Sequence, residues 1–149
     1  MRSILSANRA VYCLELATGR VVLGSNVEGY KAEQPRWGFS CSLLIDGDLL
    51  IVNAGDSGIA FEKKTGAVAW SNSGDGAGYA SPLAADLNGL HQILIFSGRK
   101  LNSVDPSNGK GNWSMDWETD YDVNAADPIV IGDTVFISSG YGTGRERLT

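Results

Sequence analysis

The sequence is poor in the residues that metal centres and acid–base catalysis most often use. Its 149 residues include one histidine and two cysteines. With His91 as the only histidine, neither a metal site built on several histidines nor a Ser-His-Asp triad is expected. Cys13 and Cys41 lie in strand-like segments and are expected to be small buried side chains, although a disulfide between them stays open.

The sequence also lacks an excess of basic over acidic residues, and it lacks long hydrophobic runs. The 12 Lys and Arg residues are outnumbered by 17 Asp and Glu residues, which gives a formal charge of -5. A nucleic acid partner is therefore not expected, because phosphate backbones attract basic surfaces. The longest apolar runs, at 43–45 and 49–52, fall far short of the roughly 20 residues of a membrane helix. Residues 1–10 contain no continuous apolar run, so no signal sequence is expected in this chain.

Glycine, in contrast, is abundant. The 19 glycines include several Asn-Gly, Asp-Gly and Thr-Gly pairs, which are typical of tight turns because glycine accepts a positive φ. No segment keeps the 3.6-residue apolar period of an amphipathic helix. The chain is therefore predicted to be all-β, with many short strands and essentially no helix.

A repeat emerges when the sequence is compared with itself. An acidic residue stands four places before a glycine three times, and the glycines recur at intervals of 47 and 43 residues. Four places beyond each glycine comes a bulky side chain. The positions of this structural repeat are Glu15, Gly19 and Leu23; Glu62, Gly66 and Trp70; and Asp105, Gly109 and Trp113. Each copy predicts a β-hairpin whose carboxylate binds turn amides.

A second set of hairpins, at 42–52, 81–96 and 127–137, alternates with the first. Two hairpins per repeat give four strands in 43 to 47 residues, which is the period of a β-propeller blade. The chain is predicted to be one partial propeller domain, 1–149, of about three blades' worth of antiparallel strands. It comprises an outer half-blade (10–26), two blades (40–71 and 80–115) and an inner half-blade (126–139). Propellers close with about 4 to 8 blades, so the sequence is interpreted as a fragment.

The segment from Phe61 through Glu62, Thr65 and Gly66 to Trp70 resembles the PQQ-like, or quinoprotein-like, propeller repeat. Residues 10–144 are similar to secreted bacterial PQQ-binding-like propellers and, more distantly, to the propeller lipoprotein of outer-membrane assembly. The resemblance implies a periplasmic or extracellular protein. Quinoprotein alcohol dehydrogenases clamp PQQ with adjacent cysteines, and Cys13 and Cys41 are not adjacent. No cofactor is therefore expected, and PQQ is suggested only by the family name.

Candidate binding residues lie in the long connections between blades. Loops on a rigid scaffold often carry recognition residues, and these connections contain Trp37, Tyr79, Tyr121 and Asn124. The alternative is that their aromatic rings pack between blades. A weak metal candidate is the alternating set Asp116, Glu118, Asp120 and Asp122, but no 12-residue calcium loop is present and a solvated acidic loop is the favoured interpretation. Ser97 and Lys100 have Ser-x-x-Lys spacing but lack the helix which that motif needs.

Two functions remain at this stage. The first is a noncatalytic binding or scaffold module of unknown ligand or partner, and the alternative is a piece of a PQQ-dependent or related quinoprotein dehydrogenase. The absence of an assembled catalytic set in the sequence favours the first and argues against an enzyme. An open arc of blades leaves two blade faces uncovered, so other propeller blades, a protein partner or a second copy of the chain are the expected partners.

Overall fold

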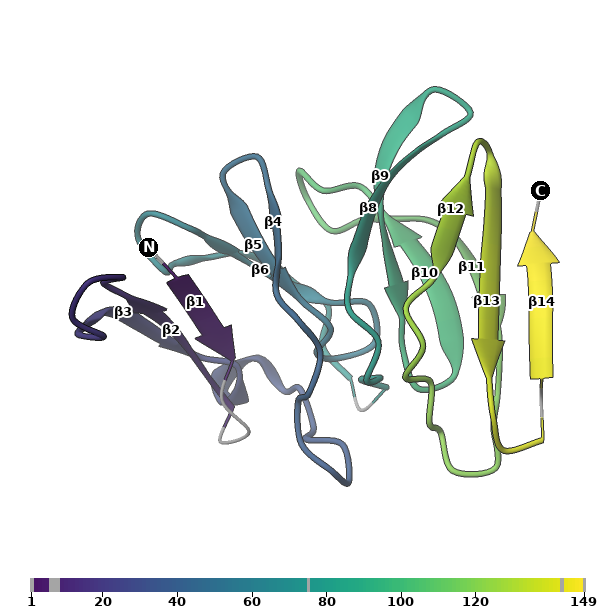
Figure 1. Ribbon diagram of the computed structural model, residues 1–149, viewed down its shortest axis with the longest axis horizontal. Coiled ribbons are helices and arrows are strands. Elements are labelled where there is room, and N and C mark those ends of the chain that lie inside the picture. The colour runs from purple at the N-terminus through teal and green to yellow at the C-terminus, as the bar shows by residue number, and fades with distance from the viewer. Residues whose placement is uncertain (1, 6–8, 75, 143, 149) are drawn as a thin grey trace.

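The structure, a computed structural model, describes residues 2–5, 9–74, 76–142 and 144–148 (Figure 1). These residues form four antiparallel sheets in chain order. The first sheet holds β1 (Arg2–Leu5), β2 (Ala10–Leu14) and β3 (Val21–Asn26). The second holds β4 (Leu44–Asp46), β5 (Leu49–Val52), β6 (Ile59–Glu62) and β7 (Val68–Ser71). The third holds β8 (Leu83–Leu87), β9 (Leu90–Phe96), β10 (Lys100–Val104) and β11 (Gly111–Asp116). The fourth holds β12 (Ile129–Ile131), β13 (Thr134–Ser139) and β14 (Gly144–Leu148).

This architecture confirms the predicted all-β arc of four-stranded propeller blades. Within each sheet, strands adjacent in sequence are adjacent in space. The two end sheets contain three strands each, because β1 and β14 extend the predicted half-blades by one strand at either end. The single helical element in the described residues is a short 3₁₀ turn, η1 (Glu28–Tyr30). No helix in this part of the chain has the length and apolarity to cross a membrane.

The hydrophobic core lies between successive sheets. Val11 of the first sheet packs in one cluster with Leu50 and Phe61 of the second. Trp70 of the second sheet packs with Ile93 and Ile95 of the third. A third cluster joins the third and fourth sheets, and includes Leu94, Leu101, Trp117, Val135 and Ile137. Each blade therefore buries its apolar face against its neighbours, as expected for stacked repeats.

The three repeat turns share one hydrogen-bonding pattern. In each, the glycine amide donates to the backbone carbonyl of the acidic residue four places earlier, at 2.8 to 2.9 Å. The acidic side chain accepts a hydrogen bond from the side chain three places later, which is Thr18, Thr65 or Asn108. The glycines have φ of 71°, 73° and 73°, a conformation that costs L-residues about 1–2 kcal/mol. The repeated sequence pattern therefore predicts both the turn and the side-chain hydrogen bond that stabilises it.

Successive blades meet where the repeat turn of one blade covers the last strand of the blade before it. The indole Nε1 of Trp70 donates to the carbonyl oxygen of Pro106 at 2.7 Å, and the ring lies against Gly109. The side chain of Asn72 donates to the carbonyl of Gly109 at 2.9 Å. Ser25, at the matching position one blade earlier, donates to the carbonyl of Gly66 at 2.5 Å. The repeat positions therefore serve the contacts between blades as well as the hairpins.

Replacing Gly109 with alanine separates these two roles. A Cβ at Gly109 would lie 2.5 Å from the Trp70 ring, whereas a Cβ built on Gly19 meets no described atom within 4 Å. Both substitutions impose the same backbone strain, but only Gly109→Ala also displaces a packed indole, at an added cost of about 1–3 kcal/mol. We expect urea denaturation to show Gly109→Ala as clearly less stable than Gly19→Ala. Equal losses would show that the ring contact does not stabilise the blades.

A second link between blades is sensitive to pH. His91 on β9 places Nδ1 2.7 Å from Asp86 and Nε2 3.0 Å from Asp46, which lies on the neighbouring blade. The hydrogen bond to Asp86, and then the bond to Asp46, raise the pKa of His91 above its ordinary value. The link therefore stabilises the fold in full below the unfolded-state pKa and is lost as the pH rises through the folded-state pKa.

We expect the free energy of unfolding to fall by under about 1 kcal/mol between about pH 5.5 and about pH 8.5 because of this link, since the imidazole is half exposed. Urea denaturation of wild type and His91→Gln at both pH values measures it. The variant should lose the part of the pH dependence that His91 contributes. An identical pH dependence in both proteins would contradict the assignment.

Candidate binding face

The connections between blades lie together along one edge of the arc, at the bottom of Figure 1. Two buried asparagines hold them there. Asn53 donates to the carbonyls of Ala80 and Phe96, both at 2.9 Å, and its Oδ1 accepts from the amide of Gly78 at 3.3 Å. Its amide group therefore joins the second blade, the next connection and the third blade.

Asn124 does the same one blade later. Its Nδ2 donates to the carbonyls of Ser97 and Gly98 at 2.9 Å, and its own carbonyl accepts from the amides of Tyr79 and Ala80 at 3.0 Å. The residue is fully buried, and its Oδ1 has no hydrogen-bond partner among the described residues. Asn124 was predicted to contact a ligand or partner, but its amide is enclosed and holds the connections of the candidate face in place.

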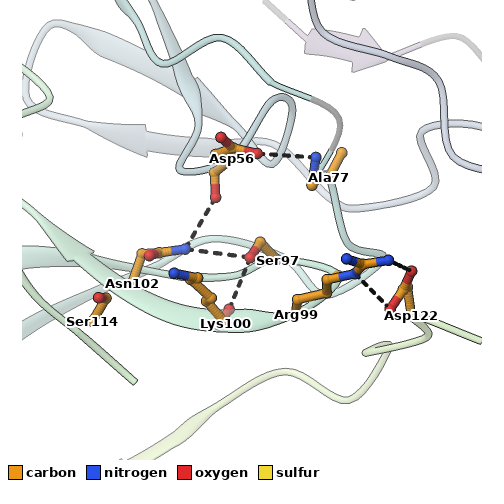
Figure 2. A pocket seen from close by; sticks show the side chains of 10 residues that line it. Asp56, Ala77, Ser97, Arg99, Lys100, Asn102, Ser114 and Asp122 are labelled. Carbon is orange, nitrogen blue, oxygen red and sulfur yellow. Dashed lines mark hydrogen bonds and ion pairs between the residues drawn. The ribbon is translucent and has the colours of Figure 1, made fainter. Parts of the chain in front are cut away.

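A polar pocket of about 330 Å³ opens on this face between the second and third blades. Figure 2 shows Asp56 on one side, with Arg99 and Lys100 on the other. The Asp56 carboxylate accepts from the amide of Gly76 at 3.1 Å, and its backbone carbonyl accepts from Asn102 at 3.0 Å. Arg99 forms a two-bond pair with Asp122, with both distances 2.9 Å (Figure 2). The pocket thus presents charges of both signs on a fixed backbone.

The hydroxyl of Ser97 in this pocket forms hydrogen bonds that stabilise the turn between β9 and β10. It donates to the carbonyl oxygen of Lys100 at 3.0 Å and accepts from Asn102 at 3.3 Å. The Lys100 amine instead pairs with Asp116 at 3.3 Å. A nucleophilic serine needs a base within hydrogen-bond reach, and the Ser97 hydroxyl is directed at backbone. The Ser-x-x-Lys spacing therefore closes a turn here.

Aromatic side chains form two pairs in this part of the chain. Trp37 and Tyr79 lie with ring centroids 5.8 Å apart, and the Arg36 guanidinium sits 5.2 Å from the Trp37 centroid. Tyr121 packs edge to face on Tyr141 at 5.3 Å. Trp37 is 58% exposed and Tyr121 is 63% exposed, so these rings are available at the surface. Tyr79 is half-buried beneath Trp37.

The four acidic candidates for a metal site point to different partners. Asp116 pairs with Lys100, and Asp122 pairs with Arg99. Glu118 and Asp120 are exposed, and Asp120 lies beside Gly142. Among the described residues, no three His, Cys, Asp or Glu side chains come together closely enough to hold a metal ion. Two of these acidic residues therefore form ion pairs. Their basic partners are Lys100 on β10 and Arg99 in the turn before it, which the sequence pattern did not predict.

The cysteines are separate free thiols. Cys41 is buried near the carbonyl of Asn53, and burial raises the pKa of its thiol. Cys13 lies in β2 of the first blade. The pair therefore does not offer the adjacent-cysteine clamp that a PQQ site in the quinoprotein dehydrogenases uses.

Asp56, Arg99 and Asn53 were missed as site residues by sequence reasoning. Asp56 follows β5 in a turn, and its carboxylate takes the space that a Cβ at Gly74 or Gly76 would need. The sequence feature that could have indicated Asp56 is its position between two closely spaced glycines, Gly55 and Gly58, directly after a strand.

Comparison with known proteins agrees with this architecture. The family model described as outer membrane protein assembly factor BamB matches residues 3–148. The crystal structure of BamB from Moraxella catarrhalis superposes with a TM-score of 0.63 at 16% identity, over 91% of this chain and 39% of that chain. This chain thus spans about two fifths of that protein's length.

A europium-containing methanol dehydrogenase superposes with a TM-score of 0.49 at 16% identity, over 72% of this chain and 21% of that chain. No curated protein matches the sequence significantly. The repeat turns, the four sheets and the match over nearly the whole chain lead to one assignment: the chain belongs to the PQQ-like β-propeller family described as outer membrane protein assembly factor BamB.

Proposed function

We propose that the chain is a noncatalytic module that binds a protein partner on the face formed by its blade connections. The observation that carries this proposal is that the blade connections hold both exposed aromatic rings, Trp37 and Tyr121, and residues of a charged pocket. Asn53 and Asn124 fix the backbone there. Aromatic and arginine side chains dominate the energetics of protein interfaces. Rigid support reduces the entropy lost on binding.

The chemistry of the pocket fits a polypeptide. The pocket has a volume of about 330 Å³ and is lined by the Asp56 carboxylate and by Lys100 and Arg99, which are paired with Asp116 and Asp122. An extended segment offers amides, carbonyls and side chains that such groups can bind, while the aromatic pairs cover its apolar side chains. The family description names outer membrane protein assembly, so we place the partner among proteins of the cell envelope.

Site-specific photo-cross-linking in envelope extract from the source organism tests the proposal. A photoreactive residue at position 37 or 121 should capture one discrete protein, and addition of Tyr121→Ala to the position-37 probe should reduce the yield several-fold. The control position is Leu90, which is half exposed and lies in the turn at the opposite end of the third blade. Equal capture from position 90, or none from 37 and 121, would contradict the proposal.

Cofactor binding distinguishes this function from a quinoprotein fragment. Titration of PQQ with calcium is expected to give no saturable change in absorbance, because Cys41 is enclosed in the core and Cys13 lies on another blade. Saturable micromolar binding would support the dehydrogenase alternative. The experiment is independent of the cross-linking result.

A further inference from the structure

The pocket between the two four-stranded sheets contains one carboxylate that has no basic partner. The Arg99 guanidinium pairs with Asp122, and the Lys100 amine pairs with Asp116. Asp56 lines the same pocket and forms no ion pair with any residue that the structure describes. Three carboxylates and two cations therefore meet here. Because each cation is already matched by its own carboxylate, the charge of Asp56 remains in excess.

The surrounding backbone fixes the Asp56 carboxylate in this position. Its Oδ1 accepts a hydrogen bond from the amide of Gly76 at 3.1 Å. A Cβ at Gly74 or at Gly76 would overlap the carboxylate, so the group occupies space that these two glycines leave open. The backbone carbonyl of Asp56 accepts from the side chain of Asn102 at 3.0 Å. The charge is therefore held in place before a ligand arrives, which reduces the entropy lost on binding.

Two neutral side chains add hydrogen-bond acceptors to the pocket. Asn102 is 8% exposed, and its Nδ2 donates to the Asp56 carbonyl and to the Ser97 hydroxyl. These bonds orient the amide, and its Oδ1 accepts no hydrogen bond from the described residues. Ser114, the cross-strand neighbour of Asn102 on β11, has a hydroxyl that is likewise unpaired within the described part of the chain. Both side chains line the pocket (Figure 2).

We propose that this pocket binds a basic side chain of the protein partner, whose cationic head pairs with Asp56 and donates hydrogen bonds to Asn102 Oδ1 and to the Ser114 hydroxyl. Ammonium and guanidinium groups carry several donors and no acceptor, which matches a pocket whose unpaired groups are acceptors. A hydrogen bond between a cation and a carboxylate is about twice as strong as a neutral one. The inference deepens the proposed function and rests on it, because it assigns an anchor residue to the partner.

The charge around the pocket favours the same class of ligand. Residues 116–127, which lead from the third sheet to the fourth, include five acidic residues and no basic residue. Asp122 of this segment lines the pocket. Complementary charge speeds association, and like charge across an interface disfavours the wrong partner. An acidic partner segment should therefore be rejected by this connection and by Asp56.

Peptide titration followed by backbone amide NMR shifts tests the assignment. The probe is acetyl-Gly-Arg-Gly-amide, and the control peptide carries citrulline, which keeps the shape of arginine but not its charge. We expect the arginine peptide to shift the amides of Gly76, Asn102 and Ser114 saturably, with a dissociation constant at least about tenfold lower than that of the citrulline peptide. No saturable shift at these amides, equal affinity for both peptides, or tighter binding of a glutamate peptide would overturn the proposal.

Removing the Asp56 charge gives the matching test on the protein side. Asp56→Asn keeps an oxygen that can accept from the amide of Gly76, so the turn should stay folded. It should weaken binding of the arginine peptide at least about tenfold. Asp48→Asn is the control, because it removes the same charge from an exposed carboxylate in the turn between β4 and β5, at the opposite end of the second blade. It should bind like wild type. Wild-type affinity in Asp56→Asn would contradict the assignment.

Cross-linking from position 37 separates this inference from the proposed function. Asp56→Asn should lower the yield several-fold, while Asp48→Asn should leave it unchanged. An unchanged yield in Asp56→Asn, beside a yield lowered by Tyr121→Ala, would overturn the basic anchor and support partner binding by the aromatic rings. If positions 37 and 121 capture nothing, the proposed function fails, and the peptide titration alone decides whether the pocket binds a basic side chain.

Discussion

Replacing Trp70 with alanine should remove about 3–5 kcal/mol from the free energy of unfolding. The indole is 7% exposed and packs with Ile93 and Ile95 of the next blade. It also donates its one hydrogen bond to Pro106 across the interface between blades. The substitution therefore opens a cavity and leaves a carbonyl without its donor. Urea denaturation followed by circular dichroism measures the loss.

Trp113→Ala is the matched control, since Trp113 holds the same repeat position one blade later. Its ring is half-buried and its hydrogen bond stays within its own blade. We expect a loss at most about half that of Trp70→Ala, because less apolar surface is removed from the core. Equal losses would show that the indoles stabilise their own blades and contribute nothing specific between them.

Replacing Asn53 with alanine should cost about 3 kcal/mol or more, because it leaves three buried backbone groups unpaired. Those groups are the carbonyls of Ala80 and Phe96 and the amide of Gly78. Denaturation midpoints give the loss. Asn26→Ala is the control, since the side chain of Asn26 accepts a single exposed bond from the amide of Glu28. It should cost under about 1 kcal/mol. A small effect for Asn53→Ala would mean that the connections are held by packing alone.

The fold could be predicted because the turn chemistry repeats. The spacing of Glu62, Thr65, Gly66 and Trp70 encodes a hairpin, its cap and its contact with the next blade, and three copies in register make a chance match improbable. The strands β1 and β14 were less visible. Arg2–Leu5 is short, and Gly144–Leu148 is rich in charge, so neither has the alternation that marks a strand.

The candidate binding face was only partly predictable from the sequence. Trp37 and Tyr121 could be chosen because large aromatic side chains in long loops need either a core or a partner. The same reasoning could not place Asn124, because the sequence does not distinguish an exposed loop asparagine from a buried one. In the structure its side-chain amide donates to the carbonyls of Ser97 and Gly98. Arg99 and Asp122 are 23 residues apart, and only the stacking of two connections brings them together.

Native-state hydrogen exchange followed by mass spectrometry tests most directly whether the chain is an arc of stacked blades. Among the residues that the structure describes, the two four-stranded sheets each contact a neighbour on both sides, whereas each end sheet contacts one. Amides of β5, β6, β9 and β10 should therefore exchange last and together, at the free energy of global unfolding. Amides of β2 and β13 should exchange earlier. Equal protection across all four sheets would contradict this account.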